Sequence, residues 1–276
     1  MPPQNPAVCL ISWNMNHSKA AWPFLWANAL PDIALLQEAT KPPQPPYWSS
    51  PPMEETWCIQ GNPREFGAAV VGLTDRVKGF PLPTRRLGDR GQGEMAVSLP
   101  GTLAGAEVVL SNGETLMVFS AYSRWQKAHY GGTIYADASA HRLISDISAL
   151  ISKKQGHKVL VAGDWNILYG YGEQGNAYWK ARYDSVFARM EALGLPFFGP
   201  HYPGGVQADP WPSELPTDSK NVPTFRKAKN NPASAERQLD FVFASEELHS
   251  RMNVQAMNDP NHWGPSDHCR VSIEVW

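Results

Sequence analysis

Short apolar runs, each next to an acidic, amide or other polar side chain, constrain the fold of this chain more than any other feature. Runs this short, bounded by turn residues, predict buried β-strands. Strand ends on a rigid sheet hold side chains in the fixed positions that a functional site requires. The runs and their polar residues are 7–12 with Asn14, 33–36 with Glu38, 115–121 with Tyr122, 158–163 with Asp164 and Asn166, 239–244 with Asp240, and 270–275 with Asp267 and His268 just before it.

The first two runs are joined by a segment that predicts a helix. Ser18 is expected to cap a short helix that continues to Leu30, and Pro23 falls near its first turn, where proline is tolerated. A strand, a crossover helix and a second strand predict a parallel pair. Asn14 and Glu38 then lie beyond the carboxyl ends of neighbouring strands, which is where ligands bind in open α/β sheets.

The remaining elements indicate an α/β fold. Asn112-Gly113 predicts a hairpin turn, and Gly194 predicts the end of a helix. The other expected elements are strands at 67–73, 94–99 and 105–111, helices at 141–154 and 178–193, and loops at 41–56 and 196–236. No repeat or composition break is visible. We therefore expect one domain over residues 1–276, a four-layer sandwich of two packed mixed β-sheets flanked by helices.

Composition excludes several classes of protein. Of the 276 residues, 42% are hydrophobic and 18% are charged, which is typical of a globular protein and not of a disordered one. The formal net charge of -2 argues against a protein that coats nucleic acid. Cys9, Cys58 and Cys269 match no disulfide framework or zinc knuckle. No signal peptide or membrane-spanning run is visible, so we expect a cytoplasmic protein that does not bind membranes.

Taken singly, each polar residue has an ordinary structural explanation. An asparagine after a strand is typical of a turn, and Gly163-Asp164-Trp165-Asn166 alone predicts a turn of the Asx type. Glu38 fits the start of a helix, and Asp267 fits a loop aspartate that accepts backbone N–H bonds. The order and number of these residues along the chain are what point to a shared site.

Together they resemble the endonuclease/exonuclease/phosphatase superfamily, which includes pancreatic deoxyribonuclease, abasic-site endonucleases, inositol-polyphosphate phosphatases and neutral sphingomyelinases. The resemblance runs in order along almost the whole chain, and its G-D-x-N, S-D-H and Q-E segments are the most specific. The matching segments are Trp13-Asn14, Leu36-Gln37-Glu38, Ala121-Tyr122, Gly163-Asp164-Trp165-Asn166, Leu239-Asp240-Phe241-Val242 and Ser266-Asp267-His268.

The resemblance implies a metal-dependent phosphodiesterase. Mg²⁺, with Mn²⁺ as a substitute, would be held by Glu38, Asn14 and Asp267, because a hard cation prefers carboxylate and amide oxygens. Such a cation relieves the repulsion between an anionic nucleophile and an anionic phosphate. The implied catalytic residues are Asp164 for deprotonating the attacking water, Asn166 for holding that water or a phosphoryl oxygen, His268 with Asp240 for stabilising the phosphorane, and Tyr122 as a donor to the phosphate.

Aromatic and basic residues near these segments predict contacts with the substrate. Arg124 and Trp125 directly follow Tyr122 and predict a phosphate contact and a stacking face. Trp165 and Trp263 are two further rings beside polar segments that could stack on a base.

Three more residues have weaker assignments to the substrate. Glu94 begins a strand and resembles a glutamate that supports a catalytic histidine in the deoxyribonuclease branch, although Tyr122 stands here in place of that histidine. His141 and Arg142 begin the helix expected at 141–154, either as a solvated helix start or as ligands of a substrate phosphate.

Basic residues gather in two loops, either as solvated charges or as walls that grip a nucleic-acid backbone. They are Arg64, Arg76, Lys78, Arg85, Arg86 and Arg90 in one loop, and Lys220, Arg226, Lys227, Lys229 and Arg237 in the other. We expect a nuclease whose substrate is nucleic acid, foremost DNA. A phosphoesterase acting on an inositol phosphate, a nucleotide or a lipid head group is the alternative, and a non-catalytic binding module is a third hypothesis.

Overall fold

The strands of the computed structural model form two six-stranded mixed sheets and one short parallel pair. The structure describes residues 5–28, 31–55, 57, 59, 65–89, 94–127, 132–151, 158–227 and 230–276. The first sheet has the order β13 (Met252–Ala256), β14 (Val271–Val275), β1 (Val8–Asn14), β2 (Ile33–Ala39), β4 (Gly67–Gly72) and β3 (Trp48–Ser50). The second has the order β11 (Phe197–Gly199), β12 (Asp240–Ala244), β10 (Lys158–Asp164), β9 (Thr115–Tyr122), β8 (Leu103–Val109) and β5 (Lys78–Leu82). The pair is β6 (Thr84–Arg86) with β7 (Met95–Val97).

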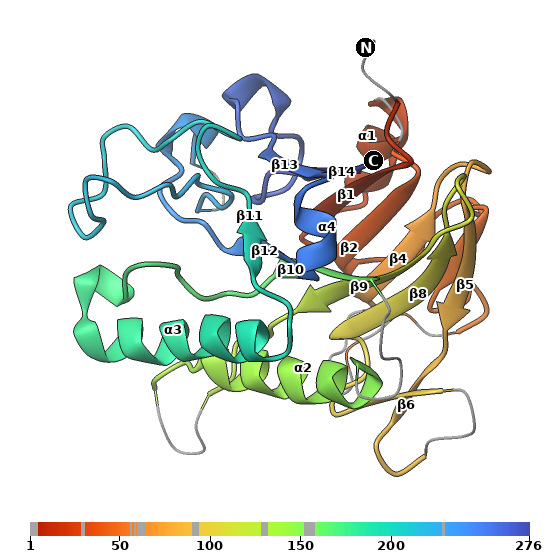
Figure 1. Ribbon diagram of the computed structural model, residues 1–276. Helices are drawn as coiled ribbons and strands as arrows, with labels where there is room; N and C mark the ends of the chain where they lie inside the picture. The colour runs from red at the N-terminus through yellow and green to blue at the C-terminus, as the bar shows by residue number, and fades with distance from the viewer. Residues whose placement is uncertain are drawn as a thin grey trace.

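Helices cover the outer faces of the sheets and complete the four layers. Figure 1 shows α2 and α3 running side by side beneath the second sheet, and α1 beside the first. The helices are α1 (Ala21–Ala27), α2 (Ala136–Ile151), α3 (Ala177–Ala192) and α4 (Glu246–His249), with short 3-10 turns at Glu173–Gly175, Pro232–Ser234 and Pro260–His262. The predicted sandwich of two mixed sheets is therefore confirmed.

Three apolar clusters hold these layers together. The inner faces of the two sheets share one cluster, in which Leu10 and Leu35 of the first sheet meet Val118 and Leu160 of the second. A second cluster joins α1 to the outer face of the first sheet, and a third joins α2 and α3 to the outer face of the second. Burial on both faces explains why the central strands read as continuous apolar runs.

One parallel strand pair in each six-stranded sheet brings the polar strand ends to one edge of the sandwich. In the first sheet β1 and β2 are parallel, so Asn14 lies opposite Gln37. In the second sheet β9 and β10 are parallel, so Asp164 lies opposite Tyr122, while antiparallel β12 places Asp240 opposite Asp164. Strands far apart in the chain therefore present their polar ends together.

Several predicted boundaries are wrong. The helix expected at 141–154 begins at Ala136, because residues 136–140 carry good helix formers but no apolar stripe, and 152–154 lie outside the described residues. Ser18 does not cap α1, which begins after Ala20 without a side-chain cap. Strand β3 lies inside the segment expected to be an irregular loop at 41–56.

The structure also adds strands that no apolar run predicted. Strands β5, β6 and β13 belong to this group, and β5 carries Pro81 at the outer edge of its sheet, where proline is tolerated. Among the described residues, no helix has the length and apolar character needed to cross a bilayer.

Candidate active site

The ends of both sheets meet at the side chain of Asn14. Its Nδ2 donates to Glu38 Oε1 at 3.2 Å and to Asp164 Oδ2 at 2.9 Å. Glu38 belongs to the first sheet and Asp164 to the second, so this amide joins carboxylates from the two sheets. Behind it Gln37 Nε2 donates to Ser120 Oγ at 2.9 Å, a second buried link between the sheets.

Glu38 points at the site because its backbone departs from regular strand geometry. Its φ is +45°, which is rare for a residue other than glycine, and the register between β2 and β4 shifts beside it. Bulges of this kind re-aim side chains next to functional sites. Glu38 Oε2 also lies 3.1 Å from Nδ1 of His17.

The polar cluster at this edge comprises Asn14, Glu38, Asp164, Asp240 and His268. His268 and the two aspartates form its buried half. Nδ1 of His268 donates to Asp240 Oδ2 at 2.8 Å, and its Nε2 lies 3.9 Å from Asp164 Oδ2. The three residues are buried, with relative exposures of 4%, 2% and 1% for His268, Asp240 and Asp164. An imidazole enclosed by two carboxylates in this way favours the protonated ring.

The pKa values of this group follow from its burial and its charges. Burial raises the pKa of Asp164 to about 7, and the charge of His268 opposes that rise. Burial by itself lowers the pKa of His268, but the charges of Asp240 and Asp164 outweigh it and raise the pKa to about 10. Between these values His268 is positively charged while Asp164 is able to accept a proton.

Tyr122 is placed as a hydrogen-bond donor. Burial first, and then the charges of Glu38 and Asp164, raise the pKa of its hydroxyl far above the ordinary range. The phenol therefore stays protonated at any physiological pH.

Asn166 is held by hydrogen bonds on every side of its amide. Its Nδ2 donates to Asp164 Oδ2 at 2.9 Å and to the carbonyl of Ser123 at 3.0 Å, and its Oδ1 accepts from Nε1 of Trp125 at 2.7 Å. Its backbone N–H also donates to Asp164 Oδ1 at 2.9 Å. With both Nδ2 hydrogens in use, Asn166 is suited to fixing its neighbours rather than to gripping a phosphoryl oxygen.

The loop before β14 is anchored to the end of β1, which places Asp267 beside the cluster. Ser266 Oγ donates to the carbonyl of Asn14 at 2.7 Å and accepts from the backbone N–H of His268 at 3.1 Å. The indole N–H of Trp13 donates to the carbonyl of His268 at 3.0 Å. Asp267 is half-buried and close enough for its charge to raise the pKa of His268.

The residues at this edge fit a hard divalent cation. Four carboxylates gather here against two histidines, and a dication would offset the excess negative charge; the carboxylates are those of Glu38, Asp164, Asp240 and Asp267. Among the described residues Asp240 Oδ1 is a buried acceptor with no hydrogen-bond partner. Oxygen-rich sites of this kind suit Mg²⁺.

Two places at this edge could hold the cation. Asp164, Asp240 and His268 bring their ligand atoms within 4.8 Å of one another. In that trio, however, His268 already uses Nδ1 to donate to Asp240. Glu38 is more open and offers only oxygens, which favours it as the principal ligand. Asn14 turns its NH₂ to the carboxylates while its Oδ1 accepts from the N–H of Asn16, so ligation through that oxygen requires the amide to turn over.

Two of the residues assigned to the substrate lie at this edge. Trp125 is exposed and bonded to Asn166. Arg124 is half-buried and near enough for its charge to oppose, in part, the rise that burial causes in the pKa of Tyr122.

The other three residues assigned to the substrate make contacts elsewhere in the structure. His141 packs between α2 and α3, where its ring nitrogens meet Ser185 and Arg189, and these contacts and its burial explain its position without a substrate. Arg142 follows it on α2, one turn before Asp146; burial raises the pKa of Asp146, and the charge of Arg142 partly opposes that rise. Glu94 is paired with Arg85 at 3.1 Å.

Trp165 and Trp263 do not offer stacking faces. Both rings are buried, with exposures of 0% and 1%: Trp165, just after β10, and Trp263, just after the 3-10 turn Pro260–His262, each lie inside an apolar cluster. A sequence position beside a polar residue does not distinguish an inward-facing ring from an outward-facing one, since neighbouring side chains point to opposite faces.

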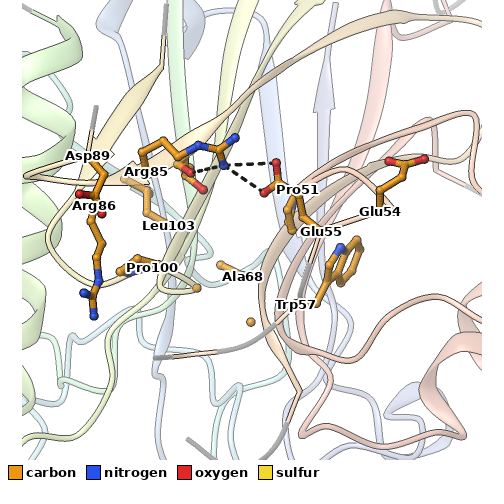
Figure 2. A pocket seen from close by; sticks show the side chains of 13 residues that line it. Pro51, Glu54, Glu55, Trp57, Ala68, Arg85, Arg86, Asp89, Pro100 and Leu103 are labelled. Atoms are coloured by element: carbon orange, nitrogen blue, oxygen red, sulfur yellow. Dashed lines mark hydrogen bonds and ion pairs between the residues drawn. The ribbon is translucent and has the colours of Figure 1, made fainter. Parts of the chain in front are cut away.

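A cavity of about 610 Å³ opens next to this edge (Figure 2). Its wall includes Gly67, which pairs with Ala39 after Glu38, and Leu103, which pairs with Ala121 before Tyr122. Figure 2 shows Arg85 bonded to Glu55 across the cavity. The lining carries Glu54, Glu55 and Asp89 against Arg85 and Arg86, so its charges are mixed rather than basic.

The two basic loops are partly neutralised in the same way. Arg76 pairs with the buried Asp32, and Arg237 pairs with Glu173. Arg226 donates to the carbonyls of Asn230 and Ser266, beside the cluster. Three members of these loops lie outside the described residues: Arg64, Arg90 and Lys229.

Sequence reasoning missed residues that hold the cluster in place. His17 pairs with Glu38, and its ring stacks on Phe66 at 5.2 Å. Gln37 and Ser120 link the sheets. A polar residue inside an apolar strand, as both of these are, was the available signal, because buried polar groups need partners.

Sequence searches give no relative for this chain: no protein-family model matches it, and no curated protein matches it. Solved structures do match. The endonuclease domain of TRAS1, a telomere-specific non-LTR retrotransposon, is 15% identical with a TM-score of 0.63, over 97% of this chain and 98% of that one. The AP endonuclease LMAP from Leishmania major is 14% identical with a TM-score of 0.62, over 98% and 88%. The catalytic domain of APE2 from Xenopus laevis is 15% identical with a TM-score of 0.64, over 97% and 91%.

These matches extend over nearly the whole chain. They show that it has the two-sheet fold of the endonuclease/exonuclease/phosphatase superfamily, as its motifs predicted. Because one fold can carry different reactions, the activity has to be argued from the residues at the strand ends.

Proposed function

We propose that this protein is a divalent-metal-dependent phosphodiesterase that hydrolyses nucleic acid, foremost DNA. The observation that carries the proposal is the meeting of Glu38, Asn14 and Asp164 from two sheets beside the buried pair of His268 and Asp240. The matching structures include a retrotransposon endonuclease domain and an AP endonuclease, which supports a nuclease among the phosphodiesterases. Mg²⁺ bound at Glu38, Asn14 and Asp267 would supply charge neutralisation at the phosphate, and Mn²⁺ would substitute for it.

The chain's own residues divide the work of an in-line attack by water. Asp164 accepts the proton of the water, because its raised pKa makes it a base suited to neutral pH. Protonated His268 donates Nε2–H to a phosphoryl oxygen as negative charge develops there, since its Nδ1 is already used by Asp240. Tyr122 donates a second hydrogen bond to the phosphate. Asn166 is a positioning residue, which holds Asp164.

The test is hydrolysis of plasmid and oligonucleotide DNA by purified protein. We expect cleavage with Mg²⁺ or Mn²⁺, loss of cleavage in excess EDTA, and recovery when metal is restored. Rates should fall steeply with added salt, because the substrate backbone is held by charge. Undiminished hydrolysis in excess chelator would overturn the metal-dependent mechanism.

A phosphoesterase acting on a small molecule is the second candidate. It is favoured by the neutralised arginines: Arg76, Arg85 and Arg237 each face a carboxylate, so less free positive charge remains for a long backbone. The same assay run on inositol phosphates, nucleotides and phospholipid head groups would separate the two. Faster turnover of a small phosphoester than of any oligonucleotide would replace the nuclease assignment.

A non-catalytic module with the same fold is the third candidate. Its test is the pair of variants Asp164→Asn and His268→Ala. Loss of wild-type turnover in both, with both variants folded at the assay temperature, would exclude it.

A further inference from the structure

Trp125 is exposed and yet fixed beside the candidate catalytic residues. Its ring is 57% exposed, whereas Trp165 and Trp263 are buried. Its indole N–H donates to Asn166 Oδ1 at 2.7 Å, and the same Asn166 donates to Asp164 at 2.9 Å. A hydrogen bond at the indole edge sets the direction of the ring while leaving a ring face open to solvent.

The segment that carries Trp125 is anchored on both sides. Before it, the backbone N–H of Ser123 donates to the carbonyl of Asp164 at 2.8 Å, and Ser123 Oγ donates to the carbonyl of Ala136 at 3.0 Å. After it, the carbonyl of Gln126 accepts from the N–H of Tyr135 at 2.7 Å. A ring on an anchored backbone loses little conformational entropy when a ligand stacks on it.

The residue before Trp125 in the chain carries a cation. Arg124 is half-buried and makes no hydrogen bond or ion pair with any described residue. Its charge already reaches the hydroxyl of Tyr122. A guanidinium and an exposed aromatic ring on successive residues match the two parts of a nucleotide, the phosphate and the base.

We propose that Trp125 stacks on an unpaired nucleobase adjoining the phosphate held by the cluster, and so makes the protein selective for single-stranded over continuous duplex nucleic acid. The inference rests on the proposed function for the position of the phosphate. In a duplex the neighbouring bases cover both faces of every base, so an indole at this position can stack only where one face is free. Stacking is tolerant of sequence, because every base has a π-face.

The test compares Trp125→Ala and Trp125→Phe with Phe80→Ala, which removes a ring of similar exposure from β5. Binding is measured with Mg²⁺ to a single-stranded phosphorothioate oligothymidylate, which resists hydrolysis, to a blunt phosphorothioate duplex of equal length, and to a strand with the same backbone in which base-free sites replace the nucleotides. For Trp125→Ala we expect about 5- to 150-fold weaker binding to the single strand, which corresponds to the ~1–3 kcal/mol of base stacking.

The affinities measured with the control variants and the control ligands should stay close to those of the wild type. Trp125→Phe keeps a π-face and should retain most of the affinity, and Phe80→Ala should bind every ligand as the wild type does. Trp125→Ala should change binding to the duplex and to the base-free strand by less than about twofold. Equal losses on the base-containing and base-free strands, or on the single strand and the duplex, would overturn the inference.

Failure of this inference and failure of the proposed function are distinguishable. Hydrolysis of DNA that depends on Mg²⁺, with single-strand binding unchanged in Trp125→Ala, would leave the phosphodiesterase and remove the stacking. The expected binding pattern without hydrolysis of any nucleic acid would leave a base-binding surface and remove the nuclease.

Discussion

The open half and the buried half of the candidate active site contain the same types of side chain, carboxylates and histidines, in different surroundings. In the open half, Glu38 is partly exposed, faces His17 and receives one hydrogen bond from Asn14. In the buried half, Asp164 and Asp240 enclose His268 with almost no exposure to solvent. Carboxylates occur in both halves, so the difference lies in solvation and not in residue type.

The difference in solvation allows one edge of the sandwich to combine control of protonation with binding of a cation. Burial moves the pKa of Asp164 up, and enclosure by carboxylates moves the pKa of His268 up, so the buried half controls where protons reside. The open half keeps its carboxylate accessible, which an exchangeable cation requires. Asn14 donates to both halves and fixes the distance between them.

Asp164→Asn should have the largest effect on turnover. The substitution keeps the shape of the side chain but removes the base, and general-base catalysis contributes roughly 10²- to 10⁴-fold. We expect a fall in kcat of that size in a variant that is still folded at the assay temperature, measured by DNA hydrolysis and thermal unfolding. Wild-type kcat in the folded variant would show that proton transfer does not depend on the buried half.

The variants Asp240→Ala and Glu38→Ala measure how much each half contributes to the free energy of unfolding. Asp240→Ala leaves the buried charge of His268 without its partner, and breaking a buried pair costs about 3–5 kcal/mol. Glu38→Ala removes a partly exposed carboxylate, for which we expect less than about 1 kcal/mol. Chemical denaturation of both variants measures the difference, and equal losses of stability would contradict the distinction between open and buried halves.

The pH dependence of hydrolysis should report the buried half. In the proposed mechanism activity requires Asp164 ionised and His268 protonated, so it should rise with pH through about 7 and fall through about 10. Asp240→Asn removes a charge that raises the pKa of His268 and should move the upper limit to lower pH. A pH–rate profile of the wild type and this variant measures both limits. An upper limit that does not move would show that another group sets it.

Glu38→Gln should have the smallest effect at saturating metal and a clear one at low metal. Loss of one charged ligand weakens cation binding by about 1.4 kcal/mol or more, so half-maximal activity should need about tenfold more Mg²⁺. A titration of activity with Mg²⁺ measures this, with Phe80→Ala as the control. An unchanged Mg²⁺ requirement would place the cation away from the open half.

The convergence of the cluster could be predicted from the sequence because it depends on strand ends. Asn14, Glu38 and Asp164 follow apolar runs, and parallel pairing of those runs brings their carboxyl ends to one edge. The same logic places Asp240 opposite Asp164. The fold and the grouping of residues therefore follow from local patterns and from general rules of sheet topology.

Contacts set by tertiary packing could not be predicted in this way. The positive φ of Glu38 and the bond from Trp125 to Asn166 depend on neighbours far away in the chain. His141 reads as a helix start in the sequence, but the helix begins five residues earlier, at Ala136, which turns His141 toward α3. Such positions depend on how elements pack, which apolar periodicity does not encode.

The most direct test of the central claim is a crystal structure of the protein soaked in Mn²⁺, with the ion located by its anomalous scattering. The account predicts one principal peak coordinated by Glu38, at the edge where the two sheets meet and with the pair of His268 and Asp240 intact. A peak held by Asp164, Asp240 and His268 with Glu38 uncoordinated, or no peak at this edge, would contradict it.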